Sequence, residues 1–330
     1  MVMSYGAVFI RPMLVLIMKE KFVFSDTEFN QCHASTIVET EQGLFMSCFA
    51  GPREGHEKTG IWSAIYKNNE WQCQKQIVDS KQENGQRTPL WNPVLSMING
   101  ELTLYYRIGK TPENWSCAYI TSLDHTNSWS KATNMPSTLT GPVRNKPLLL
   151  KNESIITPSS TELGAWSIHF EICDIDKMSC KIANAEHGKI QAIQPVILQH
   201  DNGVLQALCR TRNSYIAETW SYDNGLSWSQ LALTKIKNPN AAIDAVKIDN
   251  SGFILIYNDC SIGRYNLTLA ISTDGRNWVN KQELENSMGE YSYPSFEYSQ
   301  DGSLHILYSY NRKNIKHVVL SKNEVDKLFK

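Results

Sequence analysis

The sequence predicts an all-β fold, a six-bladed β-propeller whose blades are four-stranded antiparallel sheets. The first observation is a phrase that occurs six times, a Gly, Asn or Asp turn followed by an apolar, β-rich stretch. The leading apolar residues of these stretches are Leu44, Leu102, Ile155, Leu205, Phe253 and Leu304. They are separated by 58, 53, 50, 48 and 51 residues. A repeat of about 50 residues built from short strands and tight turns is typical of a radial β-array.

The strands of each repeat follow from the same pattern. A first strand precedes the turn by about ten residues. These strands are expected at 32–40, 90–98, 143–151, 192–200, 240–248 and 291–299. The second strand starts at the leading apolar residue. A third strand follows it and ends in a turn that carries Trp.

The Trp-bearing turns are the second observation. The segment 221–228 fits the pattern S-x-D-x-G-x-x-W, 122–129 has Thr126 in place of Gly, and 272–278 is one residue shorter. Ser and Asp side chains bind backbone groups in such turns, and Gly supplies a positive φ. The Trp is expected to pack into the neighbouring strand layer. We interpret the motif as a hairpin clamp that takes no part in chemistry.

Length and composition favour one large domain. The chain has 330 residues, is 42% hydrophobic and carries a net charge of −1. The repeats extend from about residue 30 to the end, so 1–330 is predicted to be a single propeller domain. Residues 1–25 are expected to supply a strand that closes the last blade, or to form a poorly ordered extension. Without a basic run, no nucleic-acid partner is expected.

The apolar segment 7–18 contains Arg11 and Pro12 and is too short to span a bilayer. It also lacks a basic start and a small-residue cleavage site, so neither membrane insertion nor a signal peptide is expected. The eight cysteines show no metal-binding spacing, and no metal or organic cofactor is expected. Reduced thiols in a cytoplasmic protein are the main expectation. One or two disulfides in a secreted or periplasmic enzyme are the alternative.

Strand direction predicts where a functional site lies. Because neighbouring strands are antiparallel, first strands start at the same end of the propeller at which second strands finish. Unusually polar residues occupy these positions. At the starts of first strands they are His33, Trp91, Asn92, Asn145, Lys146, Gln194, Asp244, and Tyr293 with Glu290 and Tyr291 before it. At the ends of second strands they are Arg53, Glu54, Arg107, Ser159, Ser160, Arg210, Arg212, Tyr257, Asn258, Tyr310 and Arg312.

Buried polar groups are costly unless they are paired or solvated, so this recurrence indicates a wet pocket on the propeller axis. Arg53, Arg210 and Arg212, with Lys146, are predicted to form its cationic floor. Guanidinium groups bind carboxylates in a bidentate manner, which favours an acidic oligosaccharide or glycoconjugate as the partner. Some of these arginines are alternatively expected to pair with Glu54, Glu162 or Asp244. The substrate contacts are predicted from Arg53, Glu54, Trp91, Asn92, Asn145, Lys146, Gln194, Arg210, Arg212 and Asn258.

The Asp-box turns in a six-fold array resemble the sialidase superfamily, the BNR or Asp-box propellers, over nearly the whole chain. That resemblance implies a glycoside hydrolase that removes a terminal acidic sugar, either sialic-type or uronic. It also implies a Tyr nucleophile near the start of the last inner strand, activated by a Glu. The stretch 290–294 resembles this site, with Tyr293 as nucleophile, Glu290 as activator and Tyr291 as the alternate. Tyr293 lies eleven residues before Leu304, the same spacing as His33 to Leu44.

The first repeat departs from the family pattern. Sialidases place an Arg of a Phe/Tyr-Arg-Ile-Pro motif at the start of the first inner strand, where this chain has His33. The usual acid, an Asp after the second strand of the first blade, is replaced by a stretch containing Glu54, His56 and Glu57. His33 and Asp244 are therefore candidates for acid–base catalysis.

Two alternatives stay open. A polysaccharide lyase, or a uronate-directed glycosidase, would use His33 as acid or base beside an Arg-bound carboxylate. A glycan-binding propeller without catalysis would bind the same sugar without turnover. A monomer or a small homo-oligomer is expected in each case.

Overall fold

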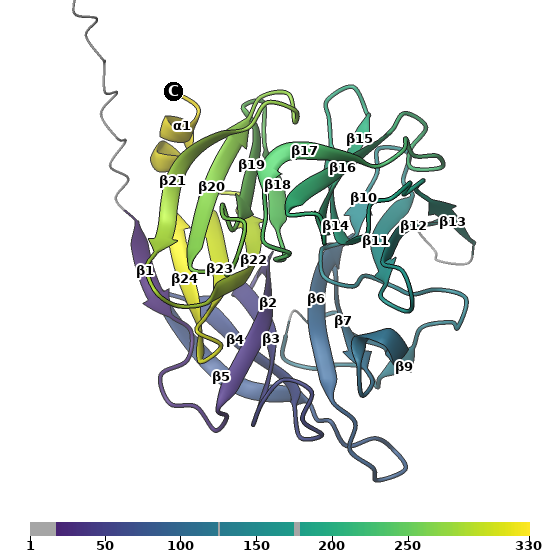
Figure 1. Cartoon of the computed structure of the whole chain (residues 1–330). Helices are drawn as coiled ribbons and strands as arrows, with labels where there is room; N and C mark the ends of the chain where they lie inside the picture. Colours follow the sequence, from purple (N-terminus) through teal and green to yellow (C-terminus); the bar gives the residue numbers. More distant parts are fainter. Residues whose placement is uncertain (1–17, 125, 175–178) are drawn as a thin grey trace, which may run out of the picture.

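The computed structural model describes residues 18–124, 126–174 and 179–330. They form six four-stranded antiparallel sheets arranged in a ring (Figure 1). The predicted six-bladed β-propeller is therefore confirmed. Whether residues 1–330 make up one domain stays a prediction.

The blades follow one another along the chain. Blade 1 contains β2 (Gln31–Thr40), β3 (Gly43–Gly51), β4 (Gly60–Lys67) and β5 (Glu70–Val78). Blade 2 contains β6 (Leu90–Ile98), β7 (Glu101–Ile108), β8 (Ser116–Ser122) and β9 (Thr133–Asn134), with the short 3-10 helix η1 (Pro112–Asn114) between β7 and β8. Blade 3 contains β10 (Leu148–Leu149), β11 (Ile155–Thr161), β12 (Ser167–Cys173) and β13 (Cys180–Asn184).

The other three blades complete the ring. Blade 4 contains β14 (Ala192–Gln199), β15 (Leu205–Thr211), β16 (Tyr215–Ser221) and β17 (Ala232–Lys237). Blade 5 contains β18 (Asp244–Ile248), β19 (Gly252–Tyr257), β20 (Asn266–Ser272) and β21 (Val279–Asn286). Blade 6 contains β22 (Tyr291–Tyr298), β23 (Leu304–Tyr310), β24 (Asn314–Leu320) and β1 (Lys19–Phe22), and helix α1 (Lys322–Leu328) follows β24.

The N-terminal strand β1 is the outermost strand of blade 6. It pairs antiparallel with β24, Lys19 opposite Val319 and Phe22 opposite Lys316. The innermost strand of blade 1, β2, packs against both β6 and β22, so the first and last blades are neighbours. Of the apolar segment 7–18, all but Met18 lies outside the described residues.

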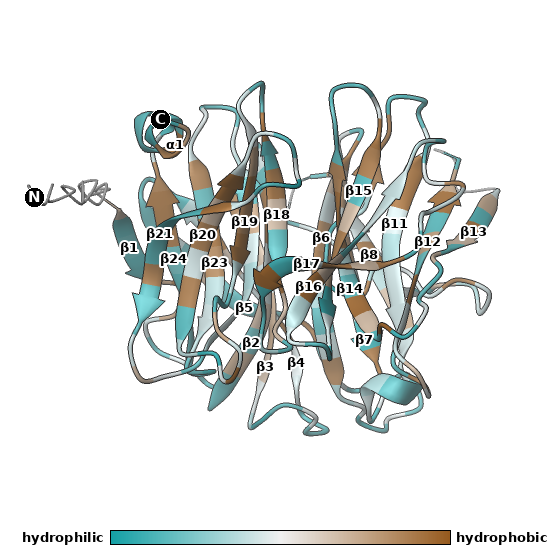
Figure 2. Ribbon diagram, turned by 45° about the horizontal axis from the view of Figure 1, so that its top comes forward, coloured by the Kyte–Doolittle hydropathy of each residue, from teal (hydrophilic) through white to brown (hydrophobic). Residues whose placement is uncertain are grey.

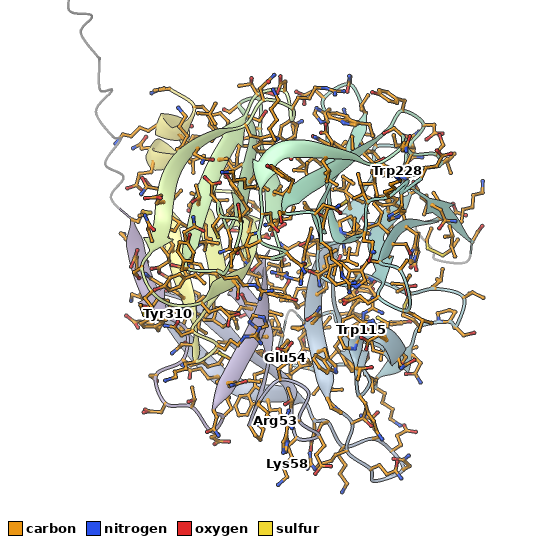
Figure 3. The ribbon with its side chains drawn as sticks, in the orientation of Figure 1. Arg53, Glu54, Lys58, Trp115, Trp228 and Tyr310 are labelled. Carbon is orange, nitrogen blue, oxygen red and sulfur yellow. A yellow bond between two sulfur atoms is a disulfide. The ribbon has the colours of Figure 1, made fainter. Side chains whose placement is uncertain are left out.

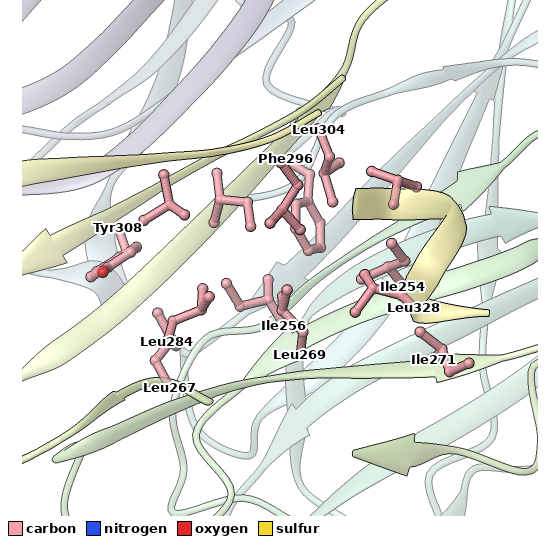
Figure 4. Close-up of a cluster of buried hydrophobic side chains, with 14 of the residues drawn as sticks. Ile254, Ile256, Leu267, Leu269, Ile271, Leu284, Phe296, Leu304, Tyr308 and Leu328 are labelled. Carbon is pink, nitrogen blue, oxygen red and sulfur yellow. The ribbon is translucent and has the colours of Figure 1, made fainter. Parts of the chain in front are cut away.

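The core lies between blades. One cluster joins blades 5 and 6 and includes Ile254, Leu269, Phe296 and Leu304, with Leu328 from α1 against it (Figure 4). Full burial of each such side chain stabilises the folded state by about 1.5–3 kcal/mol relative to leaving it exposed. Figure 2 shows apolar residues along the strands and hydrophilic residues in the loops at both ends.

A β-bulge interrupts four inner strands near the end where they start. The pairing shifts after His33 in β2, after Trp91 in β6, after Ile193 in β14 and after Ser292 in β22. The first bulged residue has a positive φ in each case, namely Ala34 (56°), Asn92 (29°), Gln194 (54°) and Tyr293 (51°). Such bulges re-aim a side chain and are frequent beside active sites.

The bulges correct one expectation. The equal spacing to Leu44 and Leu304 predicted that Tyr293 corresponds to His33. In the structure Tyr293 corresponds to Ala34, and His33 lies one residue earlier in its strand. The spacing rule was therefore wrong by one residue. The hairpin loops explain the error. Leu44 pairs with Glu39, five residues before it, whereas Leu304 pairs with Tyr298, six residues before it.

Blade 3 differs from the prediction as well. Its inner strand is only Leu148–Leu149 instead of the expected 143–151. The Asn145 side chain donates hydrogen bonds to the carbonyls of Gln194 and Pro195, at 3.2 and 3.1 Å. Pro147 has no N–H to give to a strand. The segment 143–147 is therefore attached to blade 4 through a side chain instead of through a β-ladder.

The expectation of reduced thiols is wrong for one pair. A disulfide joins Cys173 of β12 to Cys180 of β13, while the six other cysteines are unbonded. The cytoplasmic location stays a prediction. Among the described residues, no helix is long and apolar enough to cross a membrane.

Candidate functional site

Tyr293 lies at the centre of a cluster of cationic side chains. Tyr293 lies in the bulge near the start of β22, and its ring is partly exposed. Arg210 Nη1 donates a hydrogen bond of 3.1 Å to Tyr293 Oη. The guanidinium carbons of Arg144 and Arg264 lie 5.4 and 5.8 Å from the ring centroid. The ring of His33 lies 4.2 Å away, centroid to centroid.

The surroundings favour the ionised form of the Tyr293 hydroxyl. Burial raises its pKa, but the charges of Arg210 and Arg264 and a hydrogen bond with Gln194 together hold that pKa below its usual value. A positive φ at a bulky residue costs about 1–3 kcal/mol and is found mostly at functional positions. Tyr293 thus combines an activated hydroxyl with a strained backbone.

Arg210 is held rigidly. It is 9% exposed and lies at the end of β15. Its Nε donates to Asn240 Oδ1 at 2.7 Å, and its Nη1 donates to Gln194 Oε1 at 3.3 Å. Trp166 lies under the guanidinium at 5.4 Å. These contacts fix the guanidinium next to the Tyr293 hydroxyl.

Glu290 pairs with arginines. Arg312 Nε donates to both carboxylate oxygens of Glu290, at 3.0 and 2.9 Å, and Arg264 Nη1 lies 3.3 Å from Oε1. Ser292 Oγ donates to the same oxygen at 3.0 Å. Burial raises the pKa of Glu290, but Arg312 and Arg264 outweigh it and hold the pKa below its usual value. Within the described residues, both carboxylate oxygens of Glu290 are thus bonded to Arg312, Arg264 or Ser292, and none of these bonds involves Tyr293. The structure therefore gives no support to Glu290 as the direct activator of Tyr293.

The ion pairs extend to blade 1. Arg312, in the turn between β23 and β24, also donates from Nη1 to the carboxylate of Glu54. Glu54 belongs to the loop 52–59 after β3. Figure 3 shows Glu54 with Arg53 and Lys58 toward the lower end of the molecule, and Trp228 of an Asp-box turn near its upper end. The Asp-box turns follow the third strands β8, β16 and β20, at the end where second strands begin, so they and the site lie at opposite ends of the strands.

His33 is buried under this network. It is 2% exposed, and neither ring nitrogen has a hydrogen-bond partner among the described residues. Burial lowers its pKa well below the usual value, and the charges of Arg312, Arg264, Arg144 and Arg210 act in the same direction. His33 is accordingly a neutral imidazole packed against Tyr293.

Asp244 ties blade 5 to blade 6. Its Oδ2 accepts a hydrogen bond of 2.8 Å from the Phe296 amide, and its Oδ1 accepts one of 2.9 Å from the Ala245 amide. Burial raises its pKa, which Arg144 partly offsets. The residue lines a cavity of 430 Å³ between the inner strands of blades 3 to 6. Its bonds to backbone amides indicate a structural role.

Several predicted contact residues are structural anchors. Their side-chain N–H groups bind buried carbonyls in nearby loops and strands: Trp91 to Gly109 at 2.7 Å, Asn92 to Val143 at 3.2 Å, Asn145 to Gln194 and Pro195, and Asn258 to Tyr291 at 2.8 Å. Tyr291 is 1% exposed and bonds Ser287 Oγ at 2.7 Å. These polar residues at strand starts mainly hold neighbouring segments together.

The predicted cationic floor is only partly present. Arg210 touches Tyr293, whereas Lys146 pairs with Glu297 and donates to the Phe296 carbonyl at 3.0 Å. Arg53 is exposed on its loop, and Arg212 is exposed on the face of Trp166 at 4.1 Å.

The remaining cations of the cluster are Arg144, Arg264 and Arg312, none of which was selected as a site residue. Arg312 stands at the end of a second strand and Arg144 beside Asn145, where the strand-end rule applies. Arg264 precedes β20, a third strand. Third strands start at the end where second strands finish, so extending the rule to them would have found Arg264.

No group of three or more His, Cys, Asp or Glu side chains in the described part of the chain is arranged to hold a metal ion. The chemistry that the arrangement supports is binding of an anion by guanidinium groups beside an activated phenol. That chemistry suits an acidic sugar.

Comparisons place the chain in a family. A family model described as the BNR repeat-like domain matches residues 42–306. No curated protein matches. Among solved structures, Trypanosoma rangeli sialidase aligns with a TM-score of 0.76 at 14% identity, over 96% of this chain and 61% of its own.

Two further structures are similar. The K499G mutant of NanB sialidase from Streptococcus pneumoniae aligns with a TM-score of 0.71 at 13% identity, over 95% of this chain and 71% of its own. A protein of unknown function from Dyadobacter fermentans aligns with a TM-score of 0.75 at 14% identity, over 92% of this chain and 99% of its own. At such identity these likenesses establish the fold, and the family model establishes the family. The chain belongs to the BNR repeat-like domain family, and its six-bladed β-propeller has the fold of these sialidases.

Proposed function

We propose that this protein is a glycoside hydrolase that removes a terminal acidic sugar, sialic-type or uronic, from an oligosaccharide or glycoconjugate. The observation that carries the proposal is the hydrogen bond of 3.1 Å between Arg210 and the Tyr293 hydroxyl inside a cluster of guanidinium groups. Lowering the pKa of a phenol increases the fraction of its nucleophilic phenolate form at a given pH. The cations beside it attract the sugar carboxylate.

The sugar carboxylate is bound by Arg210, Arg264 and Arg312. A guanidinium has five N–H donors, and the contacts of these three arginines leave donors that can turn to a ligand. Glu290 orients Arg264 and Arg312 through its ion pairs. Tyr293 attacks the anomeric carbon beside the carboxylate, a position from which a carboxylate nucleophile would be repelled.

Replacing the nucleophile tests the proposal. Fluorogenic glycosides of a sialic acid and of glucuronic acid are incubated with the protein, and the released sugar is measured. Tyr293→Phe is expected to lower kcat by about a thousandfold or more, since no other group occupies its position. Tyr291→Phe serves as the control and keeps turnover, because Tyr291 is buried and bonded to Ser287. Turnover that survives in Tyr293→Phe would refute the assignment.

A glycan-binding propeller without turnover is the second candidate. Two observations favour it, because each leaves the Tyr293 hydroxyl without a base to take its proton. The side chain of Gln194 that bonds this hydroxyl is a neutral amide, and Glu290 is engaged by arginines. Calorimetric binding of the acidic sugar with no released product supports this candidate. The lyase alternative would show an unsaturated uronate by its ultraviolet absorbance. The burial of His33 does not favour the lyase, which needs His33 to reach the substrate as acid or base.

A further inference from the structure

The loop between β11 and β12 lies beside Arg210 of the site. The hydroxyl oxygen of Ser160, near the end of β11, accepts a hydrogen bond of 3.2 Å from the backbone N–H of Gln194. Gln194 in turn accepts one from Arg210. Alternate residues of an extended segment lie on the same side. Glu162, two residues after Ser160, is therefore directed to the side of Arg210, closer to the mouth.

The other end of the same loop also touches Arg210. Trp166, just before β12, lies 5.4 Å from the Arg210 guanidinium carbon and 4.1 Å from that of Arg212. The segment 162–166 thus flanks the arginine whose Nη1 bonds the Tyr293 hydroxyl. Glu162 is half-buried there, close enough to Arg210 and Arg212 for both charges to act on its carboxyl.

Three other buried or half-buried carboxyl groups of the site already have partners. Glu54 and Glu290 are both ion-paired with Arg312. Asp244 binds two backbone amides. Within the described residues no hydrogen bond or ion pair engages the carboxyl of Glu162.

Electrostatics distinguish Glu162 further. Burial raises its pKa above the usual value, Arg210 and Arg212 act against that rise, and Glu113 adds to it. A carboxyl with a raised pKa keeps its proton nearer to neutral pH, as a general acid requires.

We propose that Glu162 is the acid and base of the hydrolysis, an inference that rests on the proposed function. In the first step the phenolate oxygen of Tyr293, which carries no proton, bonds to the anomeric carbon. The bond from that carbon to the leaving-group oxygen breaks, and this oxygen takes the proton of Glu162. In the second step a water oxygen bonds to the anomeric carbon, the bond to Tyr293 breaks, and the Glu162 carboxylate takes a proton from that water.

The experiment compares two leaving groups in Glu162→Gln. A glycoside with an acidic phenol leaving group needs little protonation, so its rate of glycosyl-enzyme formation is expected to change by less than about tenfold. A glycoside with a sugar leaving group is expected to lose about 10²–10⁴-fold in kcat/KM, the range of general acid catalysis. The alkaline limb of the pH profile is expected to disappear with the sugar leaving group.

Glu113→Gln is the matched control, because Glu113 is an exposed carboxyl near Glu162 outside the reacting groups. Its rates at the pH optimum are expected to stay at the wild-type level with both leaving groups, while the alkaline limb moves to slightly lower pH because Glu113 no longer raises the pKa of Glu162. Glu162→Asp retains a carboxyl and should recover part of the rate, and thermal unfolding checks that both Glu162 variants fold.

Two results overturn the inference alone: equal losses with both leaving groups, or wild-type rates with both. The same leaving-group dependence in Glu54→Gln, with none in Glu162→Gln, would assign the acid to Glu54. A wild-type protein that releases neither sugar would instead remove the proposed function, and this inference with it.

Discussion

At the scale of single residues, the pKa of Tyr293 depends on charges supplied by other blades. Arg210 ends a strand of blade 4, and Arg264 precedes a strand of blade 5. Both lower the pKa of the Tyr293 hydroxyl, against the effect of burial. A phenol alone would be protonated at neutral pH. The charges that lower this pKa therefore come from blades 4 and 5, whereas Tyr293 belongs to blade 6.

Removing one of these charges tests the effect. Arg210→Met keeps the length of the side chain but loses its charge, so the pKa of Tyr293 is expected to rise. Because the phenolate is the reactive form, the acid limb of kcat/KM should move to higher pH. The pH profile and an ultraviolet titration referenced to Tyr293→Phe measure this shift. Arg212→Met, which removes an exposed charge over the ring of Trp166, should leave the acid limb in place.

The sequence predicts part of this site. The strand-end rule selects Tyr293, Gln194 and Arg210, because these positions follow from strand direction alone. It does not predict that Glu290 pairs with Arg264 and Arg312, since a carboxylate in a sequence gives no sign of which cation will fold against it. Polar residues at strand starts have two physical uses, binding ligand and joining blades. Asn92 and Asn258 show that the second is common.

At the scale of elements, a hydrogen-bonded chain joins the outer strand of blade 1 to blade 6. Trp71 Nε1 donates to His317 Nδ1 at 3.2 Å, and His317 Nε2 lies 3.0 Å from His305 Nδ1. His305 Nε2 lies 3.0 Å from Ser303 Oγ, which donates to Asp301 at 2.5 Å. Because an indole N–H can only donate, both imidazoles must be neutral and protonated on Nε2.

This chain should make the protein sensitive to acid. Burial lowers the pKa of His305 to about 4 and that of His317 to about 3. Asp301 and Glu297 favour charging of His305, and Lys21 opposes charging of His317. In the unfolded chain these histidines bind protons near pH 6.5, whereas in the folded protein they stay neutral to lower pH. The folded protein is therefore fully stable with respect to these groups above pH 6.5, and it loses that stability as the pH falls toward the folded-state pKa values.

The double variant His305→Gln/His317→Gln tests the prediction. It is expected to be less stable at pH 7, because buried hydrogen bonds are lost, but to lose less stability than the wild type between pH 6.5 and 4. Denaturant unfolding at several pH values measures both effects. His33 retains its own acid dependence in both proteins. Equal losses in the variant and the wild type would contradict the role of the chain.

At the scale of the whole molecule, the ring is closed by strands from distant parts of the sequence. Blade 6 combines β22 to β24 with β1. Lys21 of β1 also pairs with Glu70 of blade 1 at 2.7 Å. The N-terminal strand therefore touches both the last and the first blade.

Deleting residues 1–22 is expected to destabilise the propeller. The deletion uncovers the edge of β24, and an unpaired strand edge promotes aggregation. A lower thermal unfolding midpoint and faster aggregation on heating are the expected results. Lys21→Ala, which removes only an exposed ion pair, should change the midpoint little. An unchanged midpoint in the deleted chain would show that β1 is dispensable for closure.

The sequence predicts this architecture better than it predicts the site. Six copies of one phrase determine the number of blades, because each copy is a hairpin that cannot bury its apolar face alone. Blade 3 is the exception, since its inner strand is shortened where the Asn145 side chain takes the place of ladder hydrogen bonds. A side chain that replaces a backbone partner leaves the apolar periodicity unchanged and cannot be recognised from it.

The bulges of the inner strands have a consequence for how such proteins diversify. Ala34, Asn92, Gln194 and Tyr293 share one backbone conformation, each in a different blade. Exchange of the residue at one of these positions alters the functional groups at the axis without moving a strand. Blade 1 carries only a methyl group there. A propeller of this kind can therefore acquire new chemistry by single substitutions at a few equivalent positions while its ring is preserved.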